Sequence, residues 1–142
     1  MKLYASGPMT GLPNHNREGF AAAAAALRKQ GHEVINPAEL DHNAGVDLTG
    51  SGWEVNDDQY EQFMERDIEH VTDDDVDGIV FIPGWEKSGG AGREGLAALK
   101  HGKAMYVWSP VLPDELLTLH PAVFIELATT QRLERDTTTQ EA

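Results

Sequence analysis

The sequence predicts an α/β protein: a three-layer flavodoxin-like or Rossmann-like domain with a parallel sheet of four to five strands. Two observations support this prediction. Short apolar runs alternate with helix-forming segments along residues 2–108, a pattern typical of parallel strands joined by right-handed helical crossovers. The segment Gly78–Ile82 (GIVFI) is apolar almost without interruption, as expected for a strand that is covered on both faces.

The first third of the chain shows a strand, a helix and a second strand. Lys2–Ala5 has the character of a short strand, which the turn-forming sequence SGP ends. Asn16–Gln30 is rich in alanine and other helix formers, and Gly31 follows it where a C-terminal cap belongs. Glu33–Asn36 (EVIN) predicts a second strand, stopped by the proline that follows.

The middle of the chain begins with a segment of low periodicity. Glu39–Asn56 is rich in Gly, Asp, Asn and Thr, and we expect a long surface loop, which in compact domains is often a functional lid. Asp57–Val71 returns to helical periodicity. After the strand Gly78–Ile82, we expect a helix at Gly95–His101 and a fourth strand at Ala104–Trp108.

The C-terminal part of the chain has weaker signals. Pro121–Leu133 has helix-forming composition, whereas residues 134–142 are rich in Thr and charge and predict a flexible tail. We find no internal repeat and no linker between domains. We therefore expect one domain over residues 1–133, followed by the tail.

Composition and charge exclude several classes of function. The formal net charge is −13, with only 11 Lys and Arg residues, which argues against binding nucleic-acid polymers, because a duplex requires many neutralised phosphates. A single phosphate needs only a few backbone amides at a helix start. No apolar run is long enough to span a membrane, and no signal-peptide core follows the start, so we expect a cytoplasmic protein. The chain lacks cysteine, and its histidines lack ligand spacing, so we expect no metal.

The segment GWEKSGGAGREG holds the most informative side chains and glycines. Its glycines expose amides before the expected helix, and Glu94 lies at the start of that helix, beyond the carboxyl end of a strand. In open parallel sheets, ligands bind at this edge. The segment fails the Walker A pattern, which requires Gly-Lys-Ser/Thr after its second glycine. Gly90, Gly92 and Gly95 match G-x-G-x-x-G, but after the third strand rather than the first. An acidic residue at this place could also simply complement the helix dipole.

Three segments of the chain resemble the nucleoside 2-deoxyribosyltransferase-like superfamily in order and context. They are LYASGPMTG near the start, a helix ending in MERDIEHV, and DGIVFIPGWEKSGGAGREGLAALKHGKAMYV. The last is similar to the strand–loop–Glu–helix–Gly-Lys–strand signature of the superfamily. The resemblance covers roughly residues 2–108 and extends to phage and bacterial domains of unassigned function that share the SGPMTG and PGWEKS-type segments. It implies the strand order 2-1-3-4.

The resemblance also implies roles for individual residues. Glu94 matches the catalytic glutamate that attacks C1′ and forms a glycosyl ester. Asp67 matches the helix aspartate that contacts the nucleobase and assists its departure, and Tyr4 matches the tyrosine near the sugar and the nucleophile. Ser88 is similar to a serine that binds the 5′-phosphate in the nucleotide-cleaving branch, where nucleoside-specific transferases more usually have Asp. The expected substrate-binding residues are Ser6, Gly7, Ser88, Gly90 and Gly92.

These roles agree with the chemistry of an N-glycosidic bond. The bond breaks through an oxocarbenium-like transition state, which a carboxylate beneath C1′ stabilises or captures. The leaving base needs a proton or a hydrogen bond, so a second carboxyl must lie on its side. The sequence therefore predicts an N-glycosidase or deoxyribosyltransferase acting on a small nucleoside or nucleoside 5′-monophosphate, without a metal or organic cofactor. We also expect a homo-oligomer, a dimer or a multiple of one, in which a neighbouring subunit completes the site.

Two other functions remain open at this point. The glycine segment could serve a non-catalytic nucleotide-binding module as a phosphate nest, or the GAGREG match could belong to a dinucleotide-binding oxidoreductase. Trp53 and Trp85 lie in the expected loops and could stack on a base or pack beneath their own loops. The acidic run Asp73–Asp77 fits a solvated turn better than a metal site.

Overall fold

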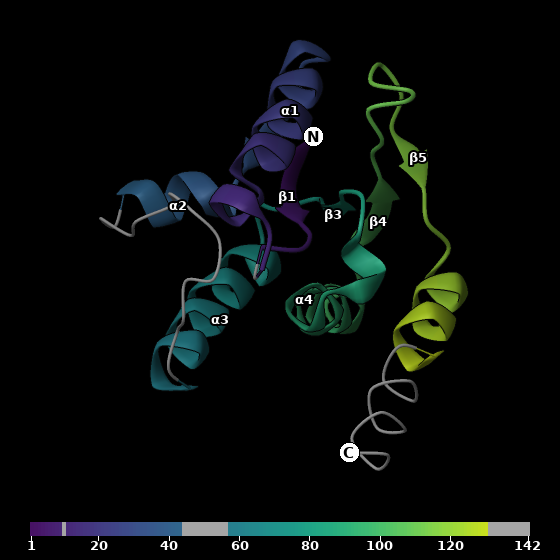
Figure 1. The fold of residues 1–142 in the computed structure, drawn as a ribbon. Coiled ribbons are helices and arrows are strands. Elements are labelled where there is room, and N and C mark those ends of the chain that lie inside the picture. Colours follow the sequence, from purple (N-terminus) through teal and green to yellow (C-terminus); the bar gives the residue numbers. More distant parts are fainter. Residues whose placement is uncertain (10, 44–56, 131–142) are drawn as a thin grey trace.

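The computed structural model describes residues 1–9, 11–43 and 57–130 of the 142-residue chain (Figure 1). The labelled elements are β1 (Lys2–Ser6), the 3₁₀ helix η1 (Pro13–Asn16), α1 (Arg17–Lys29), β2 (Glu33–Ile35), α2 (Pro37–Asn43), α3 (Asp57–Thr72), β3 (Gly78–Phe81), the 3₁₀ helix η2 (Trp85–Lys87), α4 (Gly89–Lys100), β4 (Ala104–Val107) and β5 (Leu117–Thr118). Residues 121–130 form a further helix.

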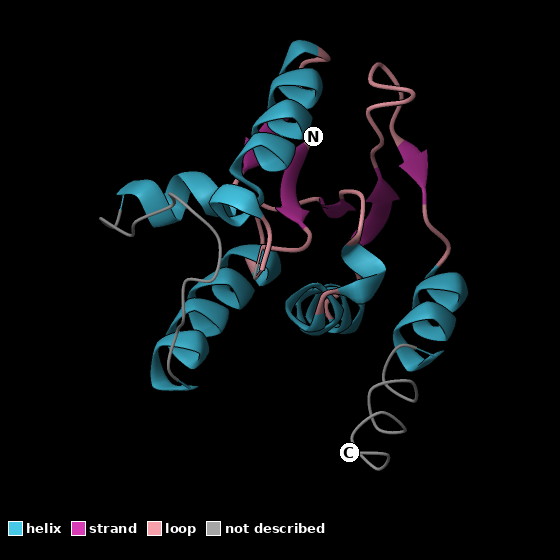
Figure 2. Ribbon diagram, viewed as in Figure 1, coloured by secondary structure: helices cyan, strands magenta, loops and turns pink. Residues whose placement is uncertain are grey.

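The strands form one sheet in the order β2-β1-β3-β4-β5. The first four of these are mutually parallel, which confirms the α/β class and the expected order 2-1-3-4. The two-residue strand β5 was not predicted, and it pairs antiparallel with β4 at the edge of the sheet (Figure 2). The sheet is therefore mostly, not wholly, parallel.

Helices cover both faces of the sheet, giving three layers (Figure 1). Leu3, Ala5 and Val80 point to one face, where they pack in a core with α1. Tyr4 and Phe81 point to the other face, in a second core with side chains of α3, α4 and the 121–130 helix. Because successive side chains of a strand alternate between faces, the odd residues of β1 meet α1 and the even residues meet α3 and α4.

The expected loop Glu39–Asn56 is wrong in its first part. Residues 39–43 belong to α2, which begins at Pro37. Proline fits the first position of a helix because its missing N–H would have no partner there, and Asn36 Oδ1 accepts a hydrogen bond from the backbone N–H of Ala38 at 2.9 Å. The remainder of the expected loop, with Trp53, lies outside the described residues.

The helix expected at Gly95–His101 begins six residues earlier, at Gly89. Ser88 is its N-cap, and the Ser88 Oγ accepts a hydrogen bond from the backbone N–H of Ala91 at 3.1 Å. Side-chain acceptors at this position satisfy one of the free N–H groups of the first turn. The glycine segment is therefore the first turn of α4 rather than a loop, and Glu94 lies in the second turn.

The C-terminal helix packs closely on α4. Phe124, within the 121–130 helix, is fully buried, and its ring lies 5.5 Å from that of Phe81. The rest of the expected helix and the tail at 134–142 lie outside the described residues. None of the described helices combines the length and the apolar character needed to cross a membrane.

Gly95 lies in tight contact with Phe124 of this C-terminal helix. A Cβ atom at Gly95 would lie 2.4 Å from Phe124 Cζ and 2.9 Å from Phe81 Cζ, whereas one at Gly92 would meet nothing within 4 Å. We expect Gly95→Ala to lower the free energy of unfolding by about 1–3 kcal/mol through overpacking. Gly92→Ala, on the same helix, should raise it by up to about 1 kcal/mol through helix propensity. Urea denaturation of both variants checks this, and equal effects would contradict the close packing.

Candidate active site

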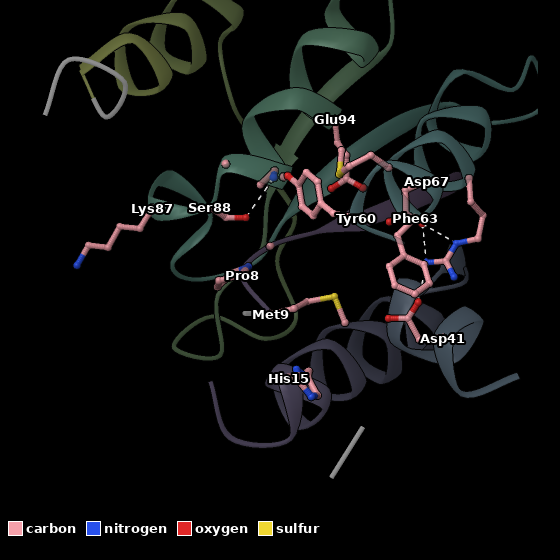
Figure 3. Close-up of a pocket in the computed structure, with 16 residues that line it drawn as sticks. Pro8, Met9, His15, Asp41, Tyr60, Phe63, Asp67, Lys87, Ser88 and Glu94 are labelled. Carbon is pink, nitrogen blue, oxygen red and sulfur yellow. Dashed lines mark hydrogen bonds and ion pairs between the residues drawn. The ribbon is translucent and has the colours of Figure 1, made fainter. Parts of the chain in front are cut away.

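A pocket of about 270 Å³ lies beyond the carboxyl ends of β1 and β3 (Figure 3). Its walls come from the segment after β1, from α2 and α3, and from the first two turns of α4. Residues that line it include Met9, Asp41, Tyr60, Asp67 and Glu94. This is the edge at which open parallel sheets bind ligands.

Glu94 is held at this pocket by two hydroxyl groups from β1. The Tyr4 hydroxyl donates to Glu94 Oε2 at 2.5 Å, and the Ser6 hydroxyl donates to Oε1 at 2.7 Å. Both donors come from the face of β1 that meets α4, because Tyr4 and Ser6 are two residues apart on the strand. Each carboxyl oxygen of Glu94 thus has one fixed donor, and the side chain is only 5% exposed.

Burial makes the negative charge of Glu94 costly. Desolvation is the main cause that raises the pKa of Glu94 to about 8, and the nearby charge of Asp67 adds to it. The hydrogen bonds from Tyr4 and Ser6 oppose this shift because they favour the ionised form. At neutral pH the carboxyl therefore retains its proton to a large extent, and it becomes a nucleophile when that proton leaves.

Tyr4 acts as a hydrogen-bond donor over the whole ordinary pH range. Its side chain is fully buried, and burial together with the charges of Glu94 and Asp67 raises the pKa of Tyr4 well above 10.0. A phenol that keeps its proton can fix the orientation of a neighbouring carboxylate. Tyr4 lies behind Glu94, among the core side chains of the sheet.

Asp67, on α3, forms the second carboxyl of the pocket. It is 8% exposed, and burial raises the pKa of Asp67 from its ordinary 3.8, whereas the Arg66 guanidinium opposes the rise. Arg66 Nε donates to Asp67 Oδ1 at 2.9 Å. The structure therefore brings Tyr4, Asp67 and Glu94 together at one site, from three elements that are far apart in the sequence.

The expected substrate-binding residues take different positions. Ser88 and Gly90 line the pocket at the start of α4, and Gly7 lines it after β1. Ser6 is fully buried and donates to Glu94, so it contacts the carboxyl from behind. Gly92 lies in α4 but is not among the residues that line the pocket.

Trp85 does not reach the pocket. Its ring is buried and stacks on Phe81, with ring centroids 4.5 Å apart. Of the two roles expected for Trp85, packing beneath its own loop is therefore the one that the structure shows. The G-x-G-x-x-G match also has a structural explanation. Its three glycines lie within α4, and Gly95 faces the ring of Phe124, whereas a dinucleotide fingerprint spans the turn between a strand and its helix.

Several residues of the site were not anticipated from the sequence. Asp41 and Arg66 lie at one end of the pocket, and Tyr60 lies near the start of α4. His15 is buried in the pocket wall, in a stretch of three residues with positive φ, at 51°, 55° and 60°. Asparagine tolerates this conformation better than most residues, so the pair of asparagines flanking His15 was an available signal for an unusual turn.

The family comparison covers every residue discussed at the centre of this site. A family model described as "Domain of unknown function (DUF4406)" matches residues 1–107. The chain belongs to this family. The DUF4406 match contains β1, α3 and α4, and so Tyr4, Asp67 and Glu94, but it ends before β5 and the 121–130 helix. A comparison with curated proteins finds no match to this chain.

Within the described parts of this DUF4406 protein, no three or more His, Asp or Glu side chains gather in a way that could hold a metal ion. The expected lack of a metal remains a prediction. The polar side chains that line the pocket carry carboxyls, a guanidinium, an ammonium, an imidazole and hydroxyls. Such groups can bind a polyhydroxylated, partly cationic molecule and exchange protons with it.

The buried Glu94 predicts a particular dependence of stability on pH. Its pKa is about 8 in the folded protein, against an ordinary 4.5, so between these values the folded state keeps a proton that the unfolded chain has lost. The free energy of unfolding therefore falls as pH rises through this window. We expect the difference in this free energy, wild type minus Glu94→Gln, to decrease from about pH 5 to about pH 9 in urea denaturation.

The variant Glu65→Gln is the matched control, because it removes an exposed glutamate from α3 that does not line the pocket. If the difference for Glu94→Gln stayed constant with pH, the carboxyl would ionise in the folded protein as it does in the unfolded chain. The described environment of Glu94 would then be wrong.

Proposed function

We propose that this protein cleaves or transfers the N-glycosidic bond of a nucleoside or a nucleoside 5′-monophosphate through a covalent glycosyl-Glu94 intermediate. The observation that carries the proposal is the buried Glu94 carboxyl at the pocket, with one hydroxyl donor fixed on each oxygen. A residue that only complemented a helix dipole would not need two buried donors from another element. The likeness of the three sequence segments to nucleoside 2-deoxyribosyltransferases supports the same conclusion.

In the proposed first step, a Glu94 oxygen attacks C1′ as the bond from C1′ to the base nitrogen breaks. The base leaves with the bonding electron pair and takes up a proton from solvent, and the Asp67 carboxylate supports it by accepting a hydrogen bond. In the second step, water or a second base attacks C1′ and gives up a proton to the Asp67 carboxylate, the glycosyl ester breaks, and the Glu94 carboxylate is released. The Tyr4 and Ser6 hydroxyls hold the carboxylate in place for both steps.

The two carboxyls of the site, Asp67 on α3 and Glu94 on α4, have different surroundings and can therefore take different roles in the reaction. Glu94 has two hydroxyl donors, whereas Asp67 has a guanidinium beside it. Environments that treat two carboxyls differently are the usual means of separating a nucleophile from a group that assists the leaving base. This difference favours catalysis over binding alone.

The start of α4 is the proposed place for the 5′-group. Lys87 and Ser88 lie together on this side of the pocket (Figure 3), which Gly90 also lines, and here the helix dipole and free backbone amides favour an anion. Ser88 Oγ accepts the Ala91 N–H, which leaves its own proton for donation to a phosphate. We therefore include 5′-monophosphates in the proposed substrate class, and a homo-oligomer whose neighbouring subunit completes the site.

The first test of the proposal replaces the nucleophile. Glu94→Gln should lower turnover by about 10³-fold or more, because a covalent nucleophile has been removed. Release of free base from a panel of nucleosides and 5′-monophosphates measures this, with Glu65→Gln as the control. Near-native rates in Glu94→Gln would remove Glu94 from the mechanism. Tight binding of a nucleotide by the wild type without any release of base would support the non-catalytic module instead.

The second test concerns the 5′-group. Aspartate caps helices about as well as serine, so Ser88→Asp should preserve α4 while placing a negative charge beside the proposed phosphate. We expect wild type to process 5′-monophosphates with a higher kcat/KM than nucleosides, and Ser88→Asp to reduce this preference by about 1–3 kcal/mol. Steady-state kinetics on matched pairs of substrates measures the change. A preference that is absent in wild type and unaltered by the substitution would show that Ser88 does not recognise the phosphate.

A further inference from the structure

Arg66 makes an unusual set of contacts at one end of the pocket. It precedes Asp67 directly on α3, and adjacent residues of a helix do not share a face. Nevertheless, its guanidinium turns back so that Nε and Nη2 lie 2.9 and 2.8 Å from Asp67 Oδ1. The guanidinium carbon lies over the ring of Phe63, one turn earlier in the helix, at 5.3 Å from the ring centroid.

The anchor for this conformation comes from a different helix. Asp41 Oδ1, on α2, lies 2.7 Å from Arg66 Nη2. Asp41 is 6% exposed, so two buried carboxylates share one guanidinium. Figure 3 shows Asp41 and Asp67 on the same side of the pocket, and Arg66 contacts both carboxylates.

The charge of Asp41 does not by itself favour an ionised Asp67. Two like charges near each other are unfavourable, and the Asp41 carboxylate acts to raise the pKa of Asp67, whereas Arg66 acts to lower it. Arginine has a long, mobile side chain that readily turns towards solvent. Asp41 can therefore stabilise an ionised Asp67 only indirectly, by holding the Arg66 guanidinium in contact with it.

We propose that Asp41 is a positioning residue that holds the Arg66 guanidinium against Asp67 and so fixes the orientation and charge of that carboxylate at the pocket. Asp41, Arg66 and Asp67 form what we call the carboxylate clamp. The clamp is a property of the folded protein. Its consequence for catalysis, support of the leaving base by a fixed Asp67, rests on the proposed function.

The charged and titratable groups around the clamp come from five elements. They are Tyr4 on β1, His15 on η1, Asp41 on α2, Arg66 on α3 and Glu94 on α4. The charge of Asp67 is one of the causes that raise the pKa of Glu94. A change in the clamp should therefore also affect the Glu94 carboxyl.

The test measures the titration of Asp67 by carbon-13 NMR of its carboxyl, whose signal is assigned by its loss in Asp67→Asn. In Asp41→Asn, the clamp predicts that the pKa of Asp67 rises, because the released guanidinium no longer stabilises the anion. A neighbouring negative charge with no positioning role predicts the opposite, a fall in that pKa. A fall, or no change, would overturn the proposal.

Two further variants make the test robust. Arg66→Lys keeps the charge but loses the fork that reaches both carboxylates, and it should also raise the pKa of Asp67, so it replaces Asp41→Asn if that variant does not fold. Glu61→Gln is the matched control, because it breaks an exposed carboxylate–arginine pair with Arg93 beside Tyr60. This control should leave the titration of Asp67 unchanged, and a similar shift there would contradict a specific clamp.

Catalysis provides a separate measurement. On a substrate that the wild type cleaves, Asp41→Asn should lower kcat/KM by roughly 10–100-fold through misplacement of Asp67. If the pKa of Asp67 rises as expected but no nucleoside or nucleotide is cleaved by the wild type, the clamp stands and the proposed function fails. If cleavage occurs and the pKa of Asp67 falls in Asp41→Asn, the proposed function stands and the clamp fails.

Discussion

The hydrogen bonds from Tyr4 and Ser6 to Glu94 are the contact on which the arrangement of the site depends. A buried carboxyl without partners would be costly, so α4 must be placed where two hydroxyls of β1 can reach Glu94. The alternation of the strand puts both hydroxyls on the same face. The position of Ser88 as N-cap then sets which side of α4 carries Glu94. The geometry of the pocket follows from these two requirements.

The charges of the pocket suggest how it would treat a substrate. Three buried carboxyls, those of Asp41, Asp67 and Glu94, outnumber the guanidinium of Arg66 and the ammonium of Lys87 among the residues that line the pocket. Burial is the main reason that Glu94 holds a proton near neutral pH, and this excess of carboxyls adds to it through the charge of Asp67. For the proposed chemistry, the same excess favours positive charge on the sugar ring, which develops as the glycosidic bond breaks. The same crowding of carboxyls that is unfavourable in the free protein would then stabilise the transition state of the reaction.

The sequence predicted the parts of the fold that have strong periodic patterns, and missed those with weak ones. Four parallel strands and their order are as expected, but the two residues of β5 are too few to show any period. The start of α4 was missed because its glycines have low helix propensity, although Ser88 is a common N-cap residue. Asp41 was hidden in a segment assigned to a loop, and Pro37 was the available sign of a helix there. The pairing of Asp41 with Arg66 spans 25 residues and depends on tertiary packing that no local pattern encodes.

The contact between Gly95 and Phe124 bears on where this domain can be divided. The family match ends at residue 107, and all the catalytic candidates precede that point. Phe124, however, fills the space beside Phe81, Trp85 and Gly95, one residue from Glu94. A fragment ending at residue 107 would contain every candidate catalytic side chain but would expose the aromatic core against which α4 packs. The end of the family match at residue 107 therefore does not coincide with the end of the packed core, which includes Phe124 of the 121–130 helix.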